Sequence, residues 1–202
     1  MKLKLSTVAV GVLFAAAGSA NAQLLGLSPL LPDAASGGII VTYNASTNVF
    51  RATGRSQNLN TPPSTSLNNG IFLLEAMISN TGMLIGSSGT LTVTNGAGGA
   101  TIFTSGNITA FGSGATNRFE FIFAAAAGGI VPVGSQIGTI LSGNGLVFSG
   151  NVPVFTSNFS NAVTLPGGIQ IGSGAADTFL IPSPAAAAAF GLAGLMATRR
   201  RR

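Results

Sequence analysis

The chain of 202 residues has no cysteine, no histidine and no tryptophan, and it has one tyrosine. Without cysteine it forms no disulfide, thiolate metal site or thiol nucleophile. Without histidine it cannot form a Ser-His-Asp triad, and zinc loses another of its usual ligands. No Walker loop or dinucleotide-binding glycine motif is present either. We therefore expect a protein that is not an enzyme and that holds no metal or cofactor.

One catalytic pairing stays open. Glu75 and Glu120 are the only glutamates, and glycoside hydrolysis uses two carboxylates. Each lies in a run of alternating apolar residues and should face away from the apolar side of its strand. Solvent exposure or pairing with an arginine is the simpler interpretation, because catalytic carboxylates need a supporting environment that tunes them. We adopt the simpler interpretation.

Charge is scarce and concentrated at the two ends. The formal net charge is +5, but the excess lies on Lys2, Lys4, Arg199, Arg200, Arg201 and Arg202. Between Gln23 and Pro182, three arginines against four acids leave a net charge of −1, with no lysine. Nucleic-acid binding needs a basic face on the folded part. We therefore expect no nucleic-acid partner.

The first segment, MKLKLSTVAVGVLFAAAGSANA at 1–22, has the three parts of a secretory signal peptide. Lys2 and Lys4 form the positive start, residues 8–17 form the apolar stretch, and Ala20 and Ala22 are the small residues at the cleavage site. We predict that Sec-type machinery exports the chain and that a signal peptidase cleaves it, so that the mature protein begins at Gln23.

The last segment, IPSPAAAAAFGLAGLMATRRRR at 181–202, combines two prolines, an uncharged run and four arginines. The run 185–198 makes a helix of about 21 Å, whereas the hydrocarbon core of a bilayer is about 30 Å thick. The segment is therefore a weak permanent anchor. The basic cluster of Arg199, Arg200, Arg201 and Arg202 should hold the C-terminus on the cytoplasmic side while the body lies outside.

This order of motif, apolar helix and arginine cluster resembles the bacterial PEP-CTERM family of sorting signals, whose tails are processed by membrane enzymes called exosortases. The Pro-Glu-Pro of that family falls on Pro182, Ser183 and Pro184, with serine in place of glutamate. The resemblance covers 181–202. It implies transient anchoring in the inner membrane, then processing and delivery to the cell surface or matrix. An ordinary tail anchor is the alternative.

Short runs of alternating apolar and polar residues fill the rest of the chain from Gly38 onward. They predict strands over 38–43, 47–53, 70–78, 90–94, 100–104, 108–111, 118–124, 136–142, 145–149, 152–155 and 162–165. The sequence NGAGG at 95–99 is the clearest hairpin turn. The polar segment 54–69 indicates a loop, and 177–184 indicates a linker to the tail.

Strands at this spacing predict an all-β fold, an antiparallel β-sandwich of Ig-like or jelly-roll topology. The expected domains are a signal helix over 1–22, the sandwich over 23–180 and a tail with a short apolar helix over 181–202. An outer-membrane barrel is the nearest alternative, but its girdles of tyrosine and tryptophan are nearly absent here.

The expected function is that of an exported, non-enzymatic cell-surface or extracellular-matrix protein. A secreted module that binds envelope polysaccharide is the alternative, although exposed tryptophan or tyrosine for stacking on sugars is scarce.

Overall fold

The computed structural model describes residues 24–79, 82–96, 99–114, 118–143, 146–148, 155–157, 163–165 and 169–182. Several predicted targeting residues lie outside these ranges: Ala20, Ala22, Ser183, Pro184, Arg199, Arg200, Arg201 and Arg202. The signal peptide, the apolar helix and the basic cluster therefore stay predictions. Within the described ranges, no helix is both long and apolar enough to cross a membrane.

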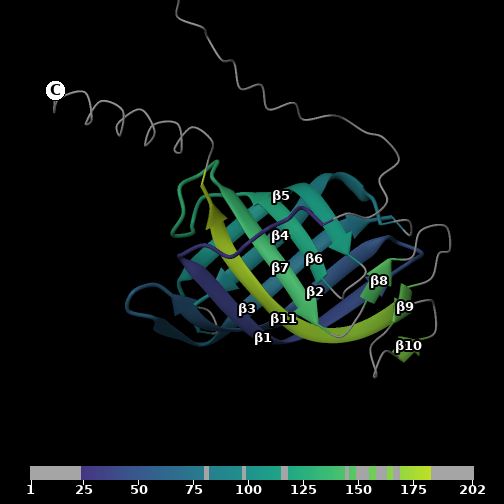
Figure 1. Ribbon diagram of the computed structural model, residues 1–202, viewed down its shortest axis with the longest axis horizontal. Helices are drawn as coiled ribbons and strands as arrows, with labels where there is room; N and C mark the ends of the chain where they lie inside the picture. The colour runs from purple at the N-terminus through teal and green to yellow at the C-terminus, as the bar shows by residue number, and fades with distance from the viewer. Residues whose placement is uncertain are drawn as a thin grey trace, which may run out of the picture.

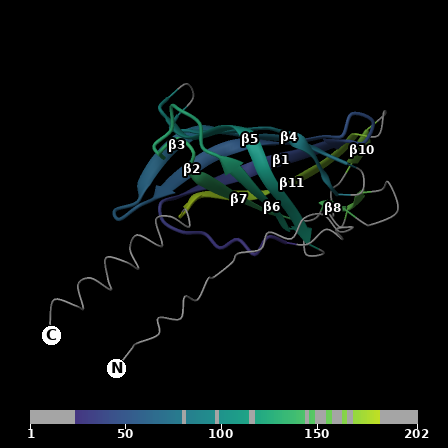
Figure 2. The same ribbon diagram turned by 90° about the horizontal axis from the view of Figure 1, so that it is seen from above.

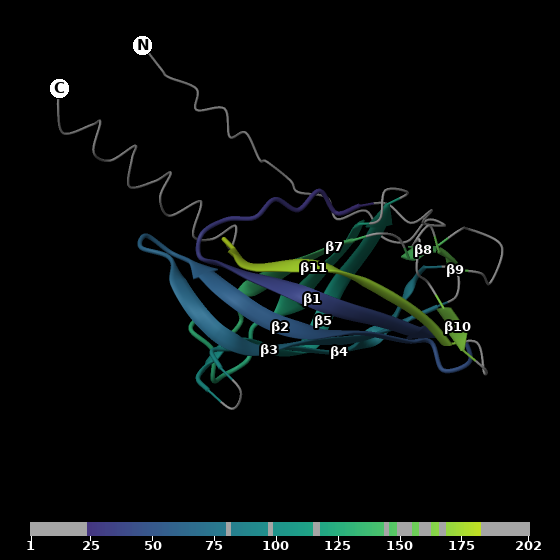
Figure 3. The same ribbon diagram turned by 90° about the horizontal axis from the view of Figure 1, so that it is seen from below.

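Eight antiparallel strands form a closed barrel (Figure 1). They are β1 (Asp33–Asn44), β2 (Val49–Asn60), β3 (Thr65–Ile78), β4 (Leu84–Thr94), β5 (Thr101–Gly114), β6 (Arg118–Ala124), β7 (Gln136–Gly143) and β11 (Ile169–Ile181). The strands β1 to β7 pair in chain order, β7 pairs with β11, and β11 pairs with β1 to close the sheet. Views turned by 90° show the strands curving around one interior (Figures 2 and 3).

Three short strands accompany the barrel. They are β8 (Leu146–Phe148), β9 (Phe155–Ser157) and β10 (Val163–Leu165). The first two pair with each other as a separate ribbon, and β10 pairs with β11. None of the three takes part in closing the barrel.

The predicted β-sandwich is wrong, because the strands belong to one sheet that closes on itself. The closing seam between β1 and β11 runs from Asp33 opposite Phe179 to Asn44 opposite Ile169. Alternation of apolar and polar residues identifies the buried face of each strand. It does not identify the neighbouring strand, so two packed sheets and one rolled sheet give the same pattern.

Two segments predicted to be irregular are also strands. Residues 54–60 and 65–69 lengthen β2 and β3, and Asn58 pairs with Ser66. Asn68 and Asn69 have positive φ, a conformation that asparagine tolerates better than most residues. The expected linker is wrong from Asp177 to Ile181, where β11 pairs with β7. The predicted hairpin around 95–99 is confirmed, since β4 and β5 are antiparallel neighbours.

Phenylalanines fill the interior of the barrel. Phe121 is fully buried, and its ring centroid lies 5.4 Å from that of Phe50, 5.0 Å from Phe111 and 6.2 Å from Phe123. Alternate residues of the strands face outward, and among them several threonines are exposed or half-buried, such as Thr53, Thr90 and Thr109. Outer-membrane barrels carry an apolar band outside and a polar interior, whereas this barrel encloses a packed apolar core.

Candidate functional site

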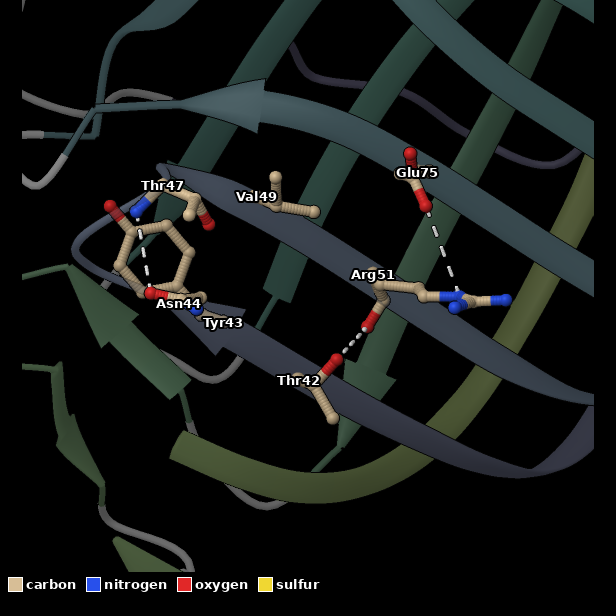
Figure 4. Close-up of a pocket in the computed structure, with 7 residues that line it drawn as sticks. All are labelled: Thr42, Tyr43, Asn44, Thr47, Val49, Arg51 and Glu75. Atoms are coloured by element: carbon tan, nitrogen blue, oxygen red, sulfur yellow. Dashed lines mark hydrogen bonds and ion pairs between the residues drawn. The ribbon is translucent and has the colours of Figure 1, made fainter. Parts of the chain in front are cut away.

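A shallow hollow on the outer face, at the β1–β2 hairpin, brings polar side chains together (Figure 4). It is open to solvent and has a volume of about 390 Å³. Its lining comes from the end of β1, the β1–β2 turn, the start of β2, and β3. The lining residues are Thr42, Tyr43, Asn44, Thr47, Val49, Arg51 and Glu75.

The turn beside the hollow is held by the Asn44 side chain. Its Oδ1 accepts hydrogen bonds from the backbone N–H groups of Ser46 (3.0 Å) and Thr47 (3.3 Å). Such Asx turns fix the backbone locally. The Tyr43 hydroxyl donates to the carbonyl of Ile78 at 3.0 Å, and burial raises the pKa of Tyr43. These hydrogen bonds hold the end of β1 and the turn in place beside the hollow.

Arg51 and Glu75 supply the charges of the hollow (Figure 4). They are opposite each other on β2 and β3, with 3.9 Å between Nε and Oε2, and their side chains are 54% and 48% exposed. A pair this exposed adds about 0–1 kcal/mol to stability. The guanidinium can donate to, and the carboxylate can accept from, the hydroxyl groups of a polar ligand.

A second cluster of charged side chains lies on the outer face on the far side of the barrel, under an N-terminal segment. Residues 24–32, which we call the N-terminal strap, cross the outside of β6, β7 and β11 (Figures 1 and 2). The strap is anchored at Leu27. Its N–H donates to Glu120 Oε2 at 3.2 Å, and its carbonyl accepts from Arg118 Nη2.

Arg118 and Glu120 form a close ion pair beneath the strap. The distance from Arg118 Nη2 to Glu120 Oε1 is 2.7 Å, and Arg118 Nε donates to the same oxygen at 2.8 Å. The Glu120 side chain is fully buried, and that of Arg118 is 34% exposed. Burying a carboxylate is costly unless it is paired and hydrogen-bonded. Both conditions are met here, one by Arg118 and the other by the backbone of Leu27.

Apolar side chains surround this pair on the outer face. Thr139 and Thr178 point into the barrel and contact each other. Their neighbours Ile140 and Phe179 therefore point outward and lie outside the core. Both are nevertheless buried. Ile140 is opposite Glu120 on β6. The strap therefore covers a strip of outer surface that combines apolar groups with one charge pair.

Two aspartates lie at the same side of the barrel. Asp33 is buried, and none of the described groups donates a hydrogen bond to its Oδ1. Burial raises the pKa of Asp177, the charge of Asp33 raises it further, and Arg118 lowers it. In the described part of the chain, no three carboxylates gather into a group that could hold a metal ion.

The structure separates the two glutamates that the sequence singled out. Both face outward, as predicted, and both pair with an arginine, as predicted. Glu75 is also exposed, whereas Glu120 is buried beneath the strap. Three strand spacings separate β3 from β6, or about 14 Å of curved sheet. Two carboxylates that point outward from these strands do not flank one glycosidic bond, which needs them about 5–9.5 Å apart.

Of the sorting motif, Pro182 is described, and it is exposed directly after the end of β11. The other targeting residues, Ser183 and Pro184 of the motif and Arg199, Arg200, Arg201 and Arg202 of the basic cluster, lie outside the described residues. The strap was missed by sequence reasoning. Its signal is the composition of LLGLSPLLP at 24–32, with five leucines and two prolines, which favours an extended apolar segment over a helix or a loop.

Comparisons with family models, with curated proteins and with solved structures each give no match for this chain.

Proposed function

We propose that the chain is an exported, non-enzymatic protein of the bacterial cell surface or extracellular matrix, sorted by a C-terminal signal of the PEP-CTERM type. The observation that carries the proposal is the tail pattern, in which Pro182, Ser183 and Pro184 precede the uncharged run 185–198 and four arginines. A signal-peptide pattern at the other end supports it.

The place of the motif after the barrel supports the same function. Ile181 is the last paired residue of β11 and lies opposite Gln136, so the motif begins without a spacer at the end of the folded body. A tail helix in the inner membrane, oriented by the basic cluster, then holds the motif at the outer boundary of the bilayer. An exosortase-like enzyme cuts there, and the released body has a net charge near −1.

Mass spectrometry of the protein recovered from the cell surface tests this function. The expected mature chain begins at Gln23 and ends near the motif, without the basic cluster. Pro182→Ala with Pro184→Ala should block processing and leave export intact. Pro132→Ala, at an exposed proline in the β6–β7 loop, is the matched control and should be processed normally. A surface or inner-membrane protein that keeps all four arginines would show a plain anchor and refute sorting.

The hollow at the β1–β2 hairpin favours one alternative function, the binding of envelope polysaccharide. Its arginine, glutamate and threonine side chains offer donors and acceptors to sugar hydroxyls. Replacing Arg51 with alanine should then abolish saturable binding of the polysaccharide. Arg55, also exposed on β2 but outside the hollow, gives the control variant Arg55→Ala, which should bind normally. Equal binding by both variants would remove the hollow as the site.

A further inference from the structure

The strap and the surface beneath it form a complete recognition unit within one chain. The surface offers a hydrogen-bond acceptor at Glu120 and a donor at Arg118, and both contact the backbone of Leu27. Two buried apolar side chains, Ile140 and Phe179, lie on the same outer side of the barrel. A site that binds a backbone and apolar groups accepts any extended segment with the same sequence. It does not require that segment to come from its own chain.

The surface is unsuited to being left uncovered. Without a strap, Glu120 loses the N–H of Leu27 as a hydrogen-bond partner, and Arg118 loses the carbonyl of Leu27 as an acceptor. An unfilled site is therefore the least stable arrangement. Two ways of filling the site remain: the strap of the same chain, or the equivalent strap of a second copy of the chain.

The strap leaves part of its own apolar surface in water. Leu25, Leu30 and Leu31 are 36%, 47% and 63% exposed. Leu30 and Leu31 lie next to the point where the strap joins β1 at Asp33. In a pair of copies that exchange these segments reciprocally, the two connections cross near the symmetry axis. The exposed leucines of both copies then meet, so the pair can bury surface that one copy cannot.

We infer that two copies of this chain exchange their N-terminal straps, each strap binding over Arg118 and Glu120 of the other copy. The partner is thus a second copy, and the exchanged strap is the link between them. This site lies apart from the sorting tail and from the hairpin hollow. Failure of tail processing would leave strap exchange untouched, and loss of exchange would leave the processing test untouched.

Sedimentation velocity of the exported protein, purified in the form in which cells process it, tests the exchange across a range of concentrations. A concentration-dependent dimer is expected. Leu30→Ser with Leu31→Ser should weaken it at least ten-fold while the barrel stays folded. The matched control is Ile130→Ser with Val133→Ser, which removes two apolar side chains of similar exposure, 52% and 71%, from the β6–β7 loop and should leave the dimer unchanged.

Leu27→Pro distinguishes a dimer that depends on the bound strap from a dimer that forms through another surface, because proline has no N–H to donate to Glu120. Exchange predicts that Leu27→Pro also loses the dimer. If that variant fails to fold, Arg118→Ala, which removes the donor to the Leu27 carbonyl, makes the same distinction. A wild-type protein that stays monomeric at all concentrations overturns the inference. So does a dimer that persists in Leu27→Pro or Arg118→Ala.

Discussion

Gly70 occupies a position in β3 where an added methyl group should disrupt the barrel. A Cβ at this residue would lie 1.8 Å from the carbonyl oxygen of Thr94 and 2.3 Å from Ser56 Oγ. The Ser56 hydroxyl donates a buried hydrogen bond to that carbonyl, from β2 to β4, through the space that the missing side chain leaves. The obstacle is backbone on one side, so a rotamer change does not relieve it.

The cost of Gly70→Ala has two parts and one offset. Overpacking of a filled interior costs about 1–3 kcal/mol. Leaving the Ser56 hydroxyl and the Thr94 carbonyl buried without each other costs about 1–3 kcal/mol. Alanine restricts the unfolded chain and returns about 0.4–1 kcal/mol. We expect a net loss of about 3 kcal/mol in the free energy of unfolding.

Urea unfolding followed by circular dichroism measures this loss, and the thermal midpoint should fall by about 6–12 °C for a body of this size. Gly106→Ala is the control within β5, because a Cβ there meets nothing within 4 Å. It should match the wild type within about 0.5 kcal/mol. If Gly70→Ala were as stable as Gly106→Ala, the close approach of β2, β3 and β4 at this point would be incorrect.

Three other substitutions probe the core and the outer face. Phe121→Ala removes a fully buried ring and should cost about 3–5 kcal/mol in urea unfolding; a loss below about 1 kcal/mol would contradict a packed barrel interior. Burial and Asp33 raise the pKa of Asp177. The stability that protonated Asp177 contributes to the folded state is therefore fully present below the ordinary pKa of 3.8, and it is lost as pH rises through the raised pKa. Asp177→Asn should therefore raise the thermal midpoint at pH 7 and change it little at pH 3, and a lower midpoint at pH 7 would disprove this. Arg51→Ala should change stability by less than about 1 kcal/mol because its pair with Glu75 is exposed, and a larger loss would show that the hollow is structural.

The alternation of residues predicted the inner face of the barrel well. In RFEFIFA, the run that forms β6, the phenylalanines at 119, 121 and 123 are buried, as their spacing of two indicates. The same run predicted that Glu120 faces the other way, which is correct. Local sequence determines which side of a strand a residue occupies, because that depends on the pleat of the backbone alone.

Closure of the barrel could not be predicted in this way. The seam joins Asp33 to Phe179, residues that are far apart in sequence, and no local pattern encodes such a pairing. The strand β11 also alternates poorly, since IQIGSGAADTFLI contains two glycines and two alanines. Such a segment resembles a linker until its partners on both sides are known.

The alternation of residues left open whether Glu120 is exposed or paired with an arginine, and it gave no sign that another segment of the chain covers Glu120. One pairing in the sheet indicates that this part of the outer face is covered. Gly138 lies opposite Phe179, and a Cβ at Gly138 would lie 2.7 Å from the phenylalanine ring. An outward aromatic ring over a glycine of the next strand covers bare backbone. The ring of Phe179 thus lies on the same strip of outer surface that the strap crosses.

The strands of the closing seam are also the strands that lead to the two predicted processing sites. β1 continues backward into the strap and the predicted cleavage site at Ala22, and β11 continues forward into Pro182. β11 is the last of the eight barrel strands to leave the ribosome, so the barrel cannot close before residue 181 has been exported. If the tail helix then stops in the membrane as proposed, closure and retention happen at the same point in export. The sorting enzyme would therefore meet Pro182 only at the end of a barrel that has all eight of its strands.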